Sequence, residues 1–210
     1  MSIGQALREA RLERRSTQRS LAERAFISDS LLSDYENGKK SMPQDLMTTL
    51  GSQLDNPRLF LEMVAAVTGG VYSSPWLDGD VDLHRVSVWA KTIEELHKGL
   101  EALGAAKAII VPPDSLGEEQ KAIVQDSLMQ VVNTRVWIDH YIAVSCREYG
   151  ISVSSLFKHI RLELENQGLL KARKRKKEVY AFADETMPGM REQQLFEWGF
   201  VQLELLHMRR

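Results

Sequence analysis

The sequence has a single cysteine, Cys146, among its 210 residues, which excludes an internal disulfide framework and fits a reducing compartment. This cysteine lies in an apolar run, Ile142 to Tyr149, where a buried thiol is expected and a reactive one is not. No apolar run approaches the roughly 18 residues of a membrane span. The first residues are charged and not apolar, so no signal peptide is expected. These absences predict a cytoplasmic protein that does not contact a membrane.

Net charge is also nearly absent, at −2, so no global field would draw the chain to nucleic acid. Residues 1–70 hold nine basic and nine acidic residues. Residues 171–177 hold six basic residues in seven positions, whereas the rest of residues 71–210 holds twelve basic and twenty acidic residues. Any contact with nucleic acid must therefore use local basic patches.

Five short helices are predicted before Gly70, because apolar residues recur there at helical spacing. Thr17 and Ser28 are good N-caps for the second and third helices, and Pro43 suits the first turn of the fourth. The pair Gly69-Gly70 then suggests a hinge. The expected helices span about residues 3–15, 18–25, 29–36, 43–54 and 58–67.

Residues 71–79 are predicted to form a connecting loop, and helices are expected beyond it. The next helix carries an apolar stripe of Leu83, Val86, Ile93, Leu96, Leu100 and Leu103. Residues 108–111, followed by Pro112-Pro113, are predicted to be either a helix end or a brief strand.

Residues 118–149 are predicted to be either one long helix or two stacked helices, ended by Gly150. Ser152 or Ser154 would cap a further helix to about residue 166, and residues 191–208 are expected to form a last amphipathic helix. The sequence therefore predicts an all-α protein. We expect one domain at 1–70, a linker at 71–80 and a helical C-terminal domain at 81–210.

The stretch QRSLAERAFISDSLLSDYENGKK, residues 18–40, predicts two helices joined by a tight turn. Ala22 is small where these helices would cross, and Leu32 and Tyr35 can point inward. The outer side of the second helix is then free to lie in the major groove of DNA, which is wide enough for a helix. The pattern T-Q-x-x-L-A, followed by Y-E-N-G-K-K, resembles the helix-turn-helix domain of Cro/cI-type (XRE family) repressors over residues 3–67.

The resemblance implies an N-terminal five-helix, lambda-repressor-like fold that binds DNA. Gln18 would bond a phosphate, and the loop after the recognition helix would meet further phosphates. Arg11 and Glu36 match a pair that forms an internal salt bridge in such repressors. The residues that the resemblance implies at the DNA are Gln18, Ser28, Asp29, Ser30, Ser33, Asp34, Asn37, Lys39 and Lys40.

Two features depart from the family's pattern. The turn between the two helices usually carries glycine, which accepts a positive φ cheaply, and here it carries Phe26. In addition, Asp29 and Asp34 would face DNA that is itself anionic. Asp29 either accepts a hydrogen bond from cytosine or only favours the N-terminus of its helix.

The basic run has three interpretations that the sequence leaves open. Followed by the alternating residues 178–182, it resembles the wing of a winged-helix hairpin, which would add phosphate contacts. It is otherwise a solvated loop that offsets the acidic remainder, or a patch for a protein or RNA. Its basic residues are Lys171, Arg173, Lys174, Arg175, Lys176 and Lys177.

No catalytic set is visible in the sequence. There is no self-cleavage dipeptide of the Ala-Gly or Cys-Gly type, no H-E-x-x-H motif and no phosphate-binding glycine loop. The five histidines lack metal-ligand spacing. We therefore expect no enzyme, no cofactor and no metal site.

The function expected from these features is that of a transcription regulator that represses by occupying an operator as a homodimer. The Leu195–Leu206 face is predicted either to pair two copies or to close the core. The segment SSPWLDGDVDLHR resembles one found in prophage regulators, which favours a mobile-element origin. A protein antirepressor or another regulatory partner is a separate expectation. The alternative is an interaction or adaptor protein with a repurposed helix-turn-helix domain.

Overall fold

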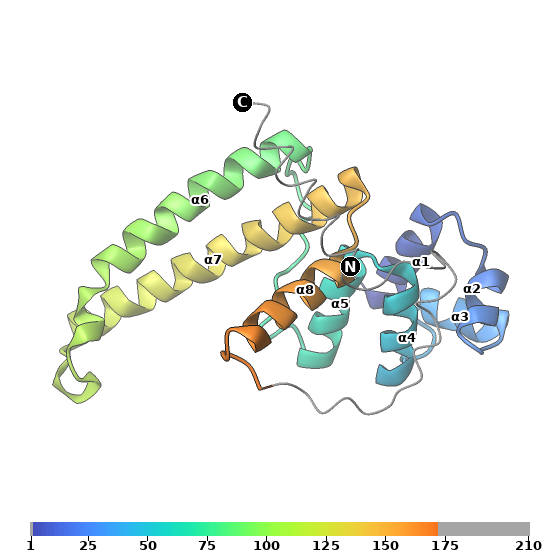
Figure 1. Ribbon diagram of the computed structural model, residues 1–210, viewed down its shortest axis with the longest axis horizontal. Coiled ribbons are helices and arrows are strands. Elements are labelled where there is room, and N and C mark those ends of the chain that lie inside the picture. Colours follow the sequence, from blue (N-terminus) through green and yellow to red (C-terminus); the bar gives the residue numbers. More distant parts are fainter. Residues whose placement is uncertain (1, 172–210) are drawn as a thin grey trace. The chain divides into compact units, whose positions relative to one another are not determined.

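The computed structural model describes residues 2–171, and their regular structure is entirely helical (Figure 1). The all-α prediction is therefore confirmed for this part of the chain. Residues 1–164 form one compact unit, and a second unit begins at Glu165. The predicted helix at 191–208, the winged-helix-like hairpin and the basic residues after Lys171 lie outside the described residues.

The N-terminal part consists of five helices, as the sequence predicts. Ser2 caps the first helix, Thr17 the second, Ser28 the third and Asn56 the fifth, each by accepting a hydrogen bond from a backbone N–H of the first turn. The helices are α1 (Ile3–Glu13), α2 (Gln18–Arg24), α3 (Asp29–Glu36), α4 (Gln44–Leu54) and α5 (Pro57–Thr68).

A small leucine-rich core holds these five helices together. Leu7, Leu21, Leu32, Leu50 and Leu59, one from each helix, are fully buried in it. Burying a leucine stabilises the fold by about 1.5–3 kcal/mol. The first helix can approach the third closely because residue 4 is glycine, where a Cβ atom would lie 2.3 Å from a carbonyl oxygen of the third helix.

Three further helices follow: α6 (Arg85–Ala105), α7 (Glu118–Tyr149) and α8 (Val153–Asn166). The long segment is one continuous helix of 32 residues, ended by Gly150 in the left-handed conformation. Residues 107–110 form a short 3₁₀ helix, η1, before a second one, η2, at residues 113–115. The alternative of a brief strand at 108–111 is therefore wrong, since the described residues offer no strand to pair with it.

Helices α6 and α7 lie side by side as an antiparallel hairpin (Figure 1). Their contact is close because Gly99 faces Thr134, where a Cβ on residue 99 would lie 2.8 Å from the threonine hydroxyl. The hydroxyl of Thr134 donates to the carbonyl oxygen of Glu95 at 2.9 Å, and that of Thr92 donates to the carbonyl oxygen of Trp137 at 3.1 Å.

Glu95 is a buried carboxylate at the centre of this hairpin, 3% exposed. It accepts hydrogen bonds from the amides of Gln130 and Asn133 at 3.0 and 2.6 Å and pairs with Lys91 and Lys98 at 3.0 and 2.9 Å. Burial opposes ionisation of Glu95, but the hydrogen bonds from the two lysines and Gln130 outweigh it and lower its pKa to about 2. The hairpin is therefore held by small and polar groups along its inner contact.

Part of the segment predicted as a linker, residues 71–80, contacts α7. The ring of Trp76 stacks on His140 with centroids 4.7 Å apart, and the N–H of Leu77 donates to His140 Nε2 at 3.0 Å. The proton of the imidazole is therefore on Nδ1, which donates to the carbonyl oxygen of Val136 at 2.8 Å. Burial lowers the pKa of His140, so the ring is neutral. The domain boundaries at 70 and 81 stay predictions.

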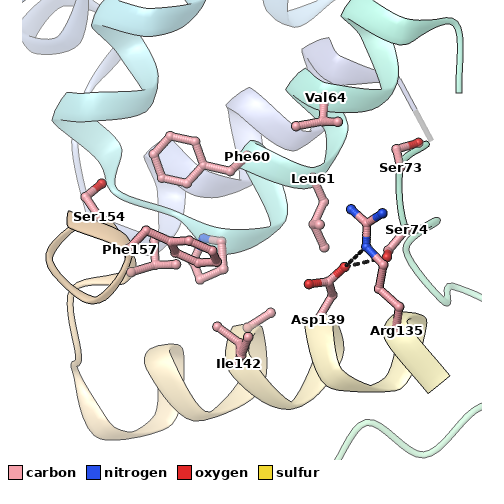
Figure 2. Close-up of a pocket in the computed structure, with 13 residues that line it drawn as sticks. Phe60, Leu61, Val64, Ser73, Ser74, Arg135, Asp139, Ile142, Ser154 and Phe157 are labelled. Atoms are coloured by element: carbon pink, nitrogen blue, oxygen red, sulfur yellow. Dashed lines mark hydrogen bonds and ion pairs between the residues drawn. The ribbon is translucent and has the colours of Figure 1, made fainter. Parts of the chain in front are cut away.

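Helices α5, α7 and α8, together with Ser73 and Ser74, surround a cavity of about 370 Å³ (Figure 2). Phe60, Ile142 and Phe157 give it apolar walls from the three helices. At one side, Asp139 accepts a hydrogen bond from the Ser74 hydroxyl, and its Oδ2 lies 3.6 Å from the Nε atom of Arg135.

Among residues 2–171, none of the helices combines the length and the apolar character that a membrane span requires.

Candidate nucleic-acid interface

The turn between α2 and α3 is built on a residue with positive φ. Phe26 has φ +56, so it takes the conformation that glycine usually has at this turn. The residue is 95% exposed, so its ring gains no packing contact in return. The N–H of Ile27 donates to the carbonyl oxygen of Ala22 at 3.0 Å, which closes the turn. Ser28 then caps α3, because its hydroxyl accepts from the N–H of Leu31 at 3.2 Å.

Helix α3, the predicted recognition helix, turns Leu32 and Tyr35 into the core and leaves its other side toward solvent. Asp29 and Ser30, in its first turn, are exposed. Ser33 and Asp34, one turn later, are half-buried at the edge of the same side. The predicted base-reading residues therefore share one accessible side of one helix.

The carboxylate of Asp34 is neutralised locally by the loop that follows α3. Its Oδ2 atom lies 2.9 Å from the ammonium nitrogen of Lys40. The N–H of Lys39 donates to the backbone carbonyl of Asp34 at 2.8 Å, and Gly38 turns the chain with φ +68. Asn37 also stays close to the helix, since its amide donates to the carbonyl oxygen of Ser33 at 2.8 Å. Lys39 and Lys40 are both exposed at the end of the recognition helix.

The predicted pair of Arg11 and Glu36 is present and buried. Arg11 Nε and Nη2 donate to the two carboxylate oxygens of Glu36 at 2.6 and 2.9 Å. This bidentate hydrogen bond raises the pKa of Arg11 although burial opposes it. A third group joins the pair, because the amide of Gln18 donates to Glu36 Oε2 at 2.8 Å. This contact fixes the first residue of α2, and the second hydrogen of that amide remains as the donor for the predicted phosphate contact.

Arg19 is a further cationic residue of this surface that the motif did not indicate. It is exposed on α2 and its Nε atom lies 3.1 Å from Glu23 Oε1. The pKa of Arg19 is raised, first by the hydrogen bond to Glu23 and also by the charge of Asp29. Arg19 is thus a positive charge near the N-terminus of α3. The place of Arg19 directly after Gln18, a predicted phosphate contact, is the feature of the sequence that could have indicated it.

Of the basic run, only Lys171 belongs to the described residues, and it is exposed. Its possible role at nucleic acid stays a prediction, as do the individual DNA contacts of the residues on α3. The geometry brings eight of the nine predicted contact residues to α3, its cap and the following loop, with Gln18 at the start of α2.

Comparison with known proteins gives one match. Residues 2–50 match the family model of a helix-turn-helix domain. No curated protein and no solved structure matches the chain. The match covers about a quarter of the sequence and coincides with α1–α4, including the pair α2 and α3 described above. The N-terminal helices are therefore a helix-turn-helix domain, as in DNA-binding regulators.

Proposed function

We propose that this protein is a sequence-specific transcriptional repressor of the Cro/cI (XRE) type that occupies an operator as a dimer. The observation that carries the proposal is the accessible side of α3, which presents Asp29, Ser30, Ser33 and Asp34 between the Ser28 cap and the loop lysines. A helix presented in this way fits the major groove. The proposal includes a cytoplasmic location, a prophage or mobile-element origin and no catalytic activity.

The acidic residues of this side are compatible with DNA. The carboxylate of Asp34 has Lys40 as a counterion at 2.9 Å. Asp29 lies in the first turn of α3, where the helix dipole favours a negative charge, and its carboxylate can accept a hydrogen bond from cytosine N4. Arg19 lies close enough to offset part of that charge.

Dimeric binding is proposed because one module of this size buries too little surface for tight and specific binding. Two copies on half-sites about one helical turn apart would combine their contacts. A second candidate function is an adaptor that uses the same surface to bind a protein. It is favoured by one observation, that the accessible side of α3 carries Asp29 and Asp34 and no basic residue.

The two functions are separated by selecting bound fragments from total genomic DNA with the full-length protein. The repressor predicts a few enriched fragments that share a two-fold symmetric motif, with affinity that falls as salt rises. A Ser30→Glu variant adds a carboxylate to the accessible side of α3 and should abolish the enrichment. The matched Ser52→Glu change, at an exposed serine of α4, should preserve it. No enrichment by the parent protein would refute the repressor.

A further inference from the structure

A stripe of six large apolar side chains on α6 is open to solvent. The stripe consists of residues spaced alternately three and four apart, and their exposed fractions range from 37% at Ile93 to 67% at Leu100. This spacing has a period of 3.5 residues, which is the repeat by which one helix packs along another as a coiled coil. Its members are Val86, Trp89, Ile93, Leu96, Leu100 and Leu103.

The buried centre of the contact between α6 and α7 lies beside the stripe and not on it. This centre uses a different line of α6, made of Val88, Thr92, Glu95 and Gly99, all buried. These residues are small or polar apart from Val88, and they meet Thr134 and its neighbours on α7. The buried centre of the hairpin is therefore formed by other residues than its largest apolar side chains.

The geometry of an antiparallel pair places one further apolar residue of α7 beside the stripe. Viewed from one end of the hairpin, one helix winds clockwise and the other anticlockwise as the chain advances. The residue directly after an inward-facing position therefore lies on the same face of the hairpin in both helices. On α6, the residues directly after the inward-facing Val88, Thr92, Glu95 and Gly99 all belong to the stripe. They are Trp89, Ile93, Leu96 and Leu100. On α7 the residue that follows the buried Ser127 is Leu128, which is 59% exposed, and the residue that follows the buried Thr134 is the exposed Arg135.

The opposite face of the hairpin is polar. Residues that directly precede the inward positions are Lys91, Glu94 and Lys98 on α6 and Asp126 and Asn133 on α7. Lys91, Lys98 and Asn133 contact Glu95, and Glu94 pairs with both lysines. The hairpin is thus amphipathic as a whole, although its apolar face has no cover among the described residues.

We propose that this apolar face, the stripe of α6 together with Leu128, binds the same face of a second copy, so that two hairpins form a four-helix arrangement. At roughly 200 Å² for a large apolar residue, the face exposes about 700 Å², close to the ~800 Å² that each partner buries in a standard interface. A soluble monomer rarely exposes a larger contiguous apolar patch than this.

The chemistry of the face also fits a second copy. All its members are uncharged, and the positions beside the stripe on the side away from α7 are Ala90, His97 and Gly104. The exposed Arg135, which follows the inward Thr134, borders the face, and Asp139 at 3.6 Å offsets its charge, so two copies that meet along the stripe bring few like charges together. A two-fold interface of this kind is self-complementary. The inference supplies the partner surface for the proposed dimer, whereas DNA contact by α3 does not depend on it.

Sedimentation equilibrium of the full-length protein tests the proposal. The parent chain should be a dimer, and Leu100→Lys should weaken self-association at least tenfold, because it places a charge in the middle of the face. Leu100 is 67% exposed, so the variant should keep its helical circular dichroism. The control is Glu101→Lys, which introduces the same side chain at the next, exposed position and should leave the dimer intact. A monomeric parent, or equal loss in both variants, would overturn the proposal.

Thiol labelling of a Leu100→Cys variant shows what covers the face, since the native Cys146 is buried. The proposal expects a labelling rate that falls as protein concentration rises through the dimerisation range. A fast rate at every concentration would mean an open face, and a slow rate at every concentration would mean a cover from the same chain. Both results contradict the proposal. A monomer that still selects operator fragments would overturn this surface and leave the DNA-binding function standing.

Discussion

Replacing Lys39 and Lys40 by alanine removes two exposed cations from the loop that follows the recognition helix. If each meets one phosphate, each contributes about −0.9 to the slope of log affinity against log salt concentration. The double variant should therefore have a slope less negative by about 1.8. Over a fourfold rise in salt, from about 50 to 200 mM, the parent should lose about 12-fold more affinity than the variant.

The structure makes the two lysines unequal. Lys40 has a counterion in Asp34 at 2.9 Å, so Lys40→Ala also leaves that carboxylate unpaired near the phosphates. We expect Lys40→Ala to weaken DNA binding more than Lys39→Ala at the same salt concentration. Conversely, Asp34→Ala releases Lys40 and should raise the affinity for non-specific DNA.

Fluorescence anisotropy of a labelled duplex across this salt range measures these slopes. The control is Lys121→Ala, which removes one exposed lysine of α7, far along the chain from the helix-turn-helix. This control should keep the parent's slope. A double variant with the parent's slope would show that the loop does not touch phosphates, and an equal change in the control would show that the effect is only one of net charge.

Three further outcomes follow from individual residues. Ser33→Ala should change the preferred base at one operator position, because a base-edge contact gives about 1–3 kcal/mol of discrimination; selection from random DNA that returns the parent's consensus would exclude this role. Phe26→Asn should raise the free energy of unfolding by about 1 kcal/mol, since asparagine tolerates positive φ and the exposed ring has no packing to lose; a lower melting temperature would contradict the strain. For His140, burial lowers the pKa below the ordinary 6.5, so the unfolded chain binds more protons below that pH and stability should fall as pH drops through 6.5. Urea unfolding of the parent and of His140→Gln checks this, and equal pH dependence in both would refute it.

The positions of the helices could be predicted from local features of the sequence. Their caps and stops are local, so Thr17, Ser28 and Gly150 could be recognised without any tertiary information, and the structure confirms them. The helix-turn-helix pattern was equally local, because a crossing of two short helices requires a small residue at Ala22 and apolar residues at fixed spacing. The backbone conformation at Phe26 was left open by the sequence, and the structure gives it a positive φ.

Contacts between residues that are far apart in the chain could not be predicted and became visible in the folded structure. Nothing local in Gln18 indicates its hydrogen bond to Glu36, and nothing local in Asp34 shows that Lys40 neutralises it. The apolar residues of α6 were visible as a helical stripe, yet a stripe looks the same in sequence whether it faces a core or solvent. The pairing of α6 with α7 through Glu95, Gly99 and Thr134 decided that question. Burial depends on which elements pack together, and periodicity along one helix does not contain that information.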